Sequence, residues 1–158
     1  TGLSRPTVTS RLEKMMKQNI LRIEAGLNIR ELGFPTACVA LETRGVGLKQ
    51  EMERSLSRCP RVLMILRPAE KANLLVFLFG EDQSSLRSTI ESLRGFSGAS
   101  LVDVYHSEPP LFPESFNLRV FVKKGDTAPC GRRCVDCVSY RNDECVGCPA
   151  VSAYRGPL

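Results

Sequence analysis

Residues 36–79 read TACVALETRGVGLKQEMERSLSRCPRVLMILRPAEKANLLVFLF and carry the strongest structural signal in the chain. This stretch begins with an apolar run at 36–42 and ends with two more, at 61–66 and 73–79. Between the first two runs, apolar residues recur at every fourth position of 48–56. Short apolar runs bounded by turn residues predict strands, and the four-residue spacing predicts an amphipathic helix.

The same alternation continues downstream. Leu86, Ile90 and Leu93 mark a second helix, and residues 100–106 form a last strand. The predicted order βαββαβ is the split βαβ or ferredoxin-like arrangement, an α+β fold with both helices on one face of an antiparallel sheet. The strands are apolar at nearly every position, which is typical of sheets buried on both faces. Because helices cover only one face, we expect the other to meet a second copy, in a homodimer or a higher even-numbered homo-oligomer.

An amphipathic helix precedes this domain. Ser4 favours a helix N-cap, and apolar residues recur at helical spacing from Val8 onward. We expect this helix to end near residues 18–19 and a short strand to follow at 20–23. Glycine, asparagine and proline in 26–35 then predict a linker.

The turn Thr1-Gly2-Leu3-Ser4 and the helix after it are typical of the second half of a helix-turn-helix. In that motif the glycine permits the tight turn, Leu3 fills the core, and the first turn of the second helix meets base edges in the major groove. Short hydroxyl groups and forked guanidinium groups suit base and phosphate contacts. A plain surface helix is the alternative interpretation. The predicted DNA-binding residues are Ser4, Arg5, Thr7, Thr9, Ser10 and Arg11.

Five of the seven cysteines lie at the end of the chain, with the spacing Cys130-x3-Cys134-x2-Cys137-x7-Cys145-x2-Cys148. Two Cys-x2-Cys pairs joined by a short loop are what a tetrahedral thiolate site requires. A disulfide staple is the alternative, but nothing marks the chain as secreted. We therefore predict that these five cysteines bind a metal ion or an iron–sulfur cluster.

The spacing leaves the identity of the metal open. Zinc would take Cys134, Cys137, Cys145 and Cys148 and leave Cys130 spare, whereas a four-iron cluster would take Cys130, Cys134, Cys137 and Cys148, with Pro149 after the last ligand. Clustered thiolates also suit copper(I). The sequence favours zinc narrowly. We place the other two cysteines elsewhere, Cys38 in the core and Cys59 in a turn with no visible partner, and we place His106 at a strand end rather than in a metal site.

Composition and charge limit the class of protein. The 158 residues are 42% hydrophobic and 25% charged, as in an ordinary globular protein. The longest apolar run, 74–79, is far too short to span a bilayer, which needs about 20 residues. The net charge of +5 comes from the two ends, since 1–35 and 115–158 each carry an excess of three basic residues. Two basic ends suit a protein that faces a polyanion, and ordinary solvated surface charge is the alternative interpretation. Because no signal peptide or membrane span is visible, we expect a cytoplasmic protein that does not bind a membrane.

Residues 2–15, the segment Asn19-Ile20-Leu21-Arg22-Ile23 and the Leu32-Gly33-Phe34 turn together resemble the Lrp/AsnC family of transcription regulators. The resemblance extends to about residue 107. It implies a helix-turn-helix, a hinge strand and a ferredoxin-like domain that dimerises and often forms octamers, with amino acids as common effectors. It also implies that the six residues predicted to bind DNA lie in the recognition helix.

The sequence departs from that family in two ways. It begins at the turn of the helix-turn-helix, so we expect about 30–50 preceding residues to exist, because a lone recognition helix cannot bury its own apolar stripe. In addition, many members carry a Gly-x-Tyr-Asp segment before the third strand, where this chain has Pro68-Ala69-Glu70-Lys71-Ala72. This difference weakens the case for an amino-acid effector and favours the cysteine segment as the sensor.

The sequence thus predicts four parts: the C-terminal part of a helix-turn-helix DNA-binding domain at 1–25, a linker at 26–35, a ferredoxin-like regulatory and dimerisation domain at 36–107, and an extended linker with a cysteine-rich metal-binding tail at 108–158. The predicted function is a DNA-binding transcription regulator that responds to metal or redox state. No phosphate loop, catalytic triad or carboxylate pair is visible, so we do not expect an enzyme. The alternatives are a metal-storage or metal-delivery module, and a sirohaem-decarboxylase-like enzyme on the same architecture.

Overall fold

The computed structural model describes residues 2, 4–68, 72–119, 121 and 123–158. Leu3, predicted to fill the core of the helix-turn-helix, and Ala69, Glu70 and Lys71 lie outside these residues. In chain order the elements are α1 (Arg5–Lys17), β1 (Leu27–Asn28), β2 (Thr36–Thr43), α2 (Val46–Leu56), β3 (Val62–Leu66), β4 (Leu74–Phe79), α3 (Gln83–Arg94), β5 (Ala99–Ser107), β6 (Ser115–Phe116), the 3-10 turn η1 (Cys134–Asp136) and α4 (Val138–Arg141).

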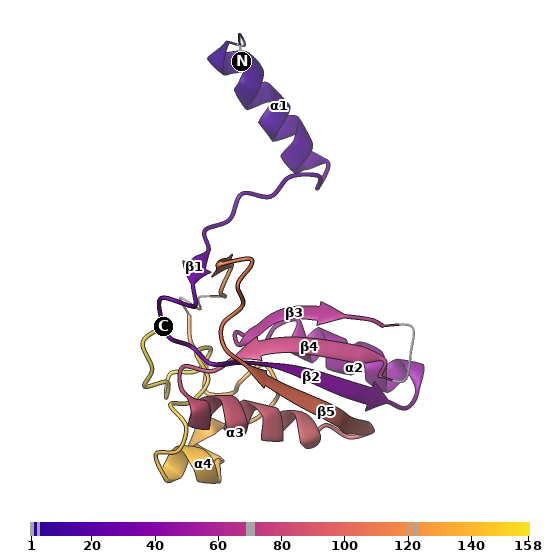
Figure 1. The fold of residues 1–158 in the computed structure, drawn as a ribbon, viewed down its shortest axis with the longest axis vertical. Helices are drawn as coiled ribbons and strands as arrows, with labels where there is room; N and C mark the ends of the chain where they lie inside the picture. Colours follow the sequence, from indigo (N-terminus) through magenta and orange to yellow (C-terminus); the bar gives the residue numbers. More distant parts are fainter. Residues whose placement is uncertain (1, 3, 69–71, 120, 122) are drawn as a thin grey trace.

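The main sheet has the order β3-β4-β2-β5, and all neighbouring strands are antiparallel. Helices α2 and α3 lie on one face of it (Figure 1). This is the ferredoxin-like βαββαβ arrangement, so the predicted fold class and the order of its elements are confirmed.

The core lies between the sheet and the two helices. Alternate residues of β2 and β4, such as Val39 and Val76, point into it and are fully buried. They meet residues spaced by four on the helices, such as Met52 of α2 and Leu86 of α3. Each buried aliphatic side chain of this size contributes about 1.5–3 kcal/mol to the hydrophobic free energy of folding.

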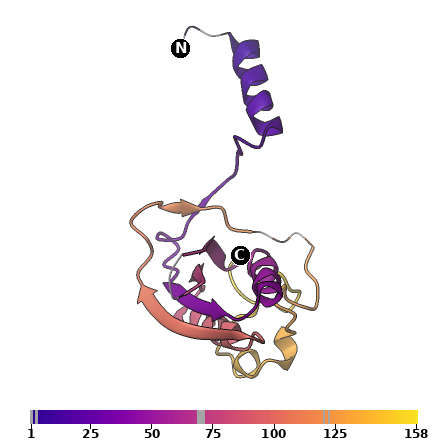
Figure 2. The ribbon, with the colours of Figure 1, turned by 90° about the vertical axis from the view of Figure 1, so that its right-hand side faces the viewer.

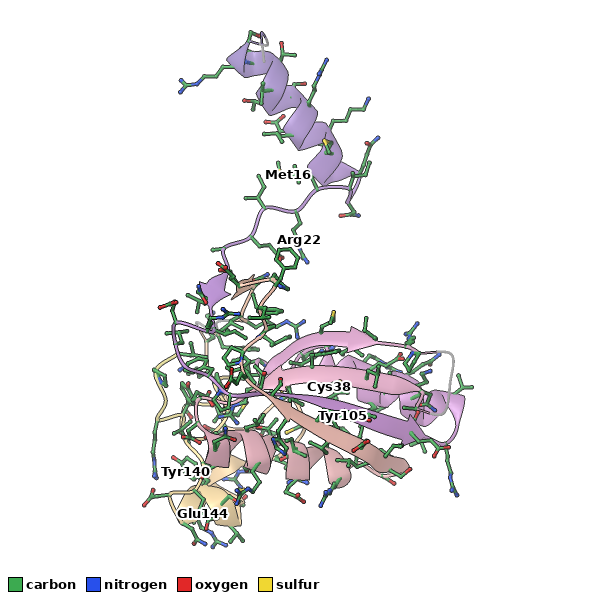
Figure 3. The ribbon with its side chains drawn as sticks, viewed as in Figure 1. Met16, Arg22, Cys38, Tyr105, Tyr140 and Glu144 are labelled. Atoms are coloured by element: carbon green, nitrogen blue, oxygen red, sulfur yellow. The ribbon has the colours of Figure 1, made fainter. Side chains whose placement is uncertain are left out.

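The opposite face of the sheet has no helix over it. Its register places Met64, Phe77, Cys38 and Tyr105 in one cross-strand row, and the last two lie on neighbouring strands (Figure 3). Met64 is 42% exposed and Tyr105 is 59% exposed. Cys38, predicted to lie in the core, therefore lies on this uncovered face.

A second, smaller core ties the predicted linker to the domain. Leu27 pairs with Phe116 in the two-stranded β1–β6 ladder. Beside this ladder, Ile29 and Phe34 are buried, and the Phe34 ring stacks on Phe79 with centroids 5.5 Å apart. Residues 26–35 are thus attached to the domain through Ile29, Phe34 and the β1–β6 ladder, while residues 30–33 stay exposed.

The strand predicted at 20–23 is wrong. These residues form no strand, and Ile20 and Ile23 are about 70% exposed, because no other strand in the described part of the chain lies beside them to complete a ladder.

Helix α1 stands apart from the rest of the molecule at the end of an extended segment (Figures 1 and 2). It has the expected bounds, with Ser4 as N-cap and proline in the first turn. In the described part of the chain, no helix has both the length and the apolar character needed to cross a membrane.

Candidate functional site

The cysteine-rich segment folds onto the ferredoxin-like domain, which is the predicted regulatory domain. It lies beside α3, with α4 at the lower edge of Figure 1. Between this segment and the C-terminal ends of α2 and α3 is a cavity of about 80 Å³. Six thiols line it: Cys59, Cys130, Cys134, Cys137, Cys145 and Cys148. The structure therefore brings together all five predicted metal ligands and adds a sixth cysteine.

Local turns aim the tail thiols into the cavity. Turn η1 places Cys134 and Cys137 close together, with the Cys137 N–H donating to the Cys134 carbonyl over 2.9 Å. The Cys148 N–H donates to the Cys134 sulfur over 3.3 Å, which links the two Cys-x2-Cys pairs. Gly147 between Cys145 and Cys148 has φ +88, a conformation that side-chain-bearing residues rarely adopt.

Tyr140 of α4 forms the packed centre of the tail (Figure 3). Its ring lies against Gly147, and its hydroxyl donates to the Ala153 carbonyl over 2.6 Å. The Arg155 guanidinium lies 4.3 Å from the ring centroid. The backbone N–H of Arg155 donates to the Val146 carbonyl. These contacts hold in place the loop that joins Cys145 and Cys148.

Arg61 joins the tail to the regulatory domain. Its side chain is 6% exposed and pairs with the buried carboxylate of Glu81 at 2.6 Å. It also donates to the Thr89 hydroxyl of α3 and to the Gly147 carbonyl of the tail. The Tyr154 hydroxyl donates to the other oxygen of Glu81 over 3.0 Å. One buried ion pair thus makes hydrogen bonds to α3, to the loop between two cysteines and to Tyr154 of the tail.

Two further hydrogen bonds connect the tail to the helices. The Ser85 hydroxyl of α3 accepts from the Val146 N–H over 3.3 Å, and the Ser55 hydroxyl of α2 donates to the Pro129 carbonyl over 3.2 Å. One contact is beside Cys145 and the other is beside Cys130. Both ends of the cysteine segment are therefore held by the regulatory domain.

Burial favours the neutral form of three of the thiols. It raises the pKa of Cys59 and Cys134, and it raises the pKa of Cys148 to about 12. These three thiols are therefore neutral near pH 7 and must lose protons to act as ligands. The fixed positive charge of Arg61 acts in the opposite direction on all three.

The thiols surround the cavity and do not meet at one point. Among the residues that the structure describes, no three Cys, His, Asp or Glu side chains are grouped closely enough to hold a single metal ion. His106, as predicted, lies near a strand end and is exposed. Whether the cysteines bind zinc, an iron–sulfur cluster or another metal stays a prediction.

Sequence analysis missed Cys59 and Arg61. Both lie in the turn between α2 and β3, more than sixty residues from the tail in sequence. Nothing local distinguishes the Cys59-Pro60-Arg61 turn from an ordinary helix-to-strand connection. A charged residue next to an apolar strand start was the one available signal, because such a residue needs a partner when it is buried.

The six residues predicted to bind DNA lie together at the start of α1. All are exposed except Thr7, which is half-buried and hydrogen-bonded to the Ser4 hydroxyl over 2.8 Å. Within the described part of the chain, neither Arg5 nor Arg11 takes part in an ion pair, so both guanidinium groups face solvent. The opposite side of α1 carries an apolar stripe in which Val8 and Leu12 are each more than a third exposed.

Neither protein-family models nor curated proteins give a match to this sequence. Solved structures do resemble it. A feast or famine regulatory protein from M. tuberculosis, solved with L-methionine, has a TM-score of 0.60 and 15% identity, with 70% of this chain and 76% of that chain covered. The leucine response regulatory protein LrpA from Mycobacterium tuberculosis has a TM-score of 0.60 and 15% identity over 72% and 78% of the two chains.

An AsnC family transcriptional regulator from Agrobacterium tumefaciens is similar at a TM-score of 0.54 and 16% identity, with 67% of this chain and 71% of that chain covered. At such identities the likeness concerns the fold. The neighbours named above are transcription regulators by their descriptions. This chain therefore has the fold of Lrp/AsnC-type transcription regulators.

Proposed function

We propose that this protein is a DNA-binding transcription regulator of the Lrp/AsnC type, not an enzyme, whose cysteine site makes it responsive to metal or redox state. The observation that carries the proposal is an exposed basic helix attached by an extended segment to a ferredoxin-like domain. Regulators with this fold supply the precedent. We propose that the protein works as a homodimer or a larger even-numbered oligomer.

In this proposal α1 is the recognition helix. Ser4 and Thr7 lie at its N-terminal end, where a recognition helix meets base edges. The guanidinium groups of Arg5 and Arg11 are free to contact phosphates or guanine edges. The apolar stripe through Val8 and Leu12 lies on the other side of α1 and would face away from the DNA.

The cysteine site is the proposed sensor. Ligation would hold the tail thiols in one arrangement, and the tail is bonded to the ends of α2 and α3 through Arg61, Ser85 and Ser55. A change in the tail would thus reach the regulatory domain, and through it the spacing of the two recognition helices in an oligomer. By linkage, DNA would change the affinity for metal by the same factor by which metal changes the affinity for DNA.

The experiment is a salt titration of binding to the protein's own promoter DNA, with full-length protein and fluorescence anisotropy. We expect the logarithm of the binding constant to fall linearly with the logarithm of salt concentration, with a slope of about −0.9 for each phosphate contacted. Arg11→Ala should weaken binding and reduce the slope by about one unit if Arg11 contacts phosphate. Arg87→Ala, which removes an exposed arginine from α3, is the matched control and should leave both unchanged.

Equal curves for wild type and Arg11→Ala would contradict the assignment of α1. Curves that are unaffected by loading or removing metal would contradict the sensing role and leave DNA binding in place. A metal-storage or metal-delivery module is the second candidate, and the six thiols around one cavity favour it. Such a module would bind metal while promoter occupancy stayed the same.

A further inference from the structure

Cys59 is the one thiol in the cavity that does not belong to the tail. It lies in the turn between α2 and β3, where its N–H donates to the Leu56 carbonyl over 3.0 Å and its carbonyl accepts from the Val62 N–H. Both neighbours are buried in the main core. The regulatory domain therefore presents this sulfur from a fixed position.

The size of the cavity decides between kinds of ligand. A zinc ion sits about 2.3 Å from each of four sulfurs and leaves no free volume between them. Here six thiols surround about 80 Å³, which is room for several water-sized spheres of roughly 10–15 Å³ each. No three ligand groups in the described part of the chain are grouped for a single ion. The volume fits a body of several atoms.

An iron–sulfur cluster is such a body, and cysteine thiolates hold it. We propose that this cavity binds a four-iron iron–sulfur cluster and that Cys59 is one of its ligands, the other three coming from the tail. Each coordinating thiol loses one proton to solvent as its sulfur bonds to iron, and two ferrous ions, two ferric ions and four inorganic sulfide ions supply the core, so that assembly needs no separate oxidant. The inference rests on the metal-binding role proposed above but not on DNA binding.

Arg61 links the turn that carries Cys59 to the tail. Cys59 and Arg61 belong to one turn, and Arg61 bonds to the Gly147 carbonyl between Cys145 and Cys148. Its buried positive charge lies among the thiols and would offset thiolate charge. A cluster that includes Cys59 would therefore connect the α2–β3 turn to the tail at two points, through the cluster and through the hydrogen bond from Arg61 to the Gly147 carbonyl.

The test uses full-length protein purified without oxygen, and the same protein reconstituted without oxygen from equal amounts of ferrous and ferric iron together with sulfide. Iron, sulfide and zinc are quantified, and the alkylation of each cysteine is followed by mass spectrometry. We expect iron and sulfide together, and a fall of about tenfold or more in the alkylation rate of Cys59 on loading, because reactivity follows thiolate access. Cys38, on the uncovered sheet face, is the internal control and should react equally in both states.

Two variants separate ligation from shielding. Cys59→Ser should change the electron paramagnetic resonance signal of the reduced cluster and shorten its lifetime in air, whereas Cys38→Ser should change neither; far-ultraviolet circular dichroism checks that both fold. An equal alkylation rate of Cys59 in wild type with and without the cluster, together with an unchanged signal in Cys59→Ser, would overturn the role of Cys59. One zinc per chain, with no uptake of iron and sulfide, would overturn the cluster.

The same samples are assayed on promoter DNA. Failure of Cys59 ligation with intact, metal-dependent DNA binding would remove this inference alone. Failure of all metal uptake would remove the inference and the sensing role together. Loss of salt-dependent DNA binding in a protein that still carries the cluster would remove only the regulator assignment.

Discussion

Arg61 shows how much one side chain can connect. It is buried, its charge is matched by Glu81, and its remaining N–H groups reach α3 and the tail. An ion pair of this kind contributes little beyond what two apolar residues would give, but removing one partner leaves an uncompensated buried charge. The residue therefore matters most for how the tail is placed.

We expect Arg61→Ala to lower the free energy of unfolding by about 3–5 kcal/mol, because it strands the Glu81 carboxylate in the interior. Urea unfolding followed by circular dichroism measures the change. Arg67→Ala is the matched control: it also removes an arginine from an ion pair, with Glu53, but Arg67 is 69% exposed. The free energy of unfolding should fall much less in the control, and similar decreases in both variants would contradict the buried role of Arg61.

The Glu53–Arg67 pair gives a pH-dependent prediction. Hydrogen bonding to Arg67 lowers the pKa of Glu53 below its ordinary value of 4.5. The unfolded chain then binds the proton more readily, so this pair stabilises the fold above about pH 4.5 and loses that contribution as pH falls through the lowered pKa. Wild type should exceed Glu53→Gln in stability at pH 7, and the difference should shrink by pH 3. A constant difference over that range would show that the ion pair is not its source.

At the scale of elements, the sequence predicted most of the main sheet. Strands such as 61–66 and 73–79 are continuous apolar runs between turn residues, and this local pattern needs no knowledge of distant partners. Residues 20–23 also carry the pattern, but a strand requires a neighbour and none lies there. The grouping of the tail cysteines followed from their spacing, whereas Cys59 could not be predicted because its contact is a product of tertiary packing.

The loop between the last two cysteines makes a prediction with an internal control. Gly147 has φ +88, and an added Cβ would lie 3.1 Å from the Tyr140 ring. Gly147→Ala should therefore destabilise the tail by about 1–2 kcal/mol and reduce metal uptake. Gly47→Ala changes a glycine of α2 with open space around it and should stabilise the protein by about 0.4–1 kcal/mol. Thermal unfolding with metal analysis tests both, and a neutral Gly147→Ala would contradict the strained turn.

At the scale of the whole molecule, the uncovered sheet face is the main apolar surface that a single copy leaves exposed to solvent. The cross-strand row of Met64, Phe77, Cys38 and Tyr105 is apolar apart from one hydroxyl and is partly exposed. Burying such a face against a second copy is the usual way to remove an exposed apolar patch. We therefore expect a stable dimer at micromolar concentration.

Tyr105→Glu tests this expectation. A carboxylate on this face would have to be desolvated at the interface, so the variant should dissociate into monomers in multi-angle light scattering. Val138→Glu, on the exposed side of α4, is the control and should leave the mass unchanged. A wild-type monomer, or a dimer that Tyr105→Glu does not weaken, would show that this face is not the interface.

For the proposed DNA-binding role, the β1–β6 ladder has a consequence for the choice of operator. The ladder anchors the chain at Leu27, and the N–H groups of residues 18–21 bond back to the last turn of α1, so the extended connection between the domain and α1 is residues 22–26. At about 3.3–3.6 Å per extended residue, this segment reaches roughly 17 Å. Major-groove half-sites one helical turn apart are separated by about 34–36 Å. The length of this segment therefore limits which half-site spacings one dimer can bind, and adding or removing residues there would widen or narrow that range.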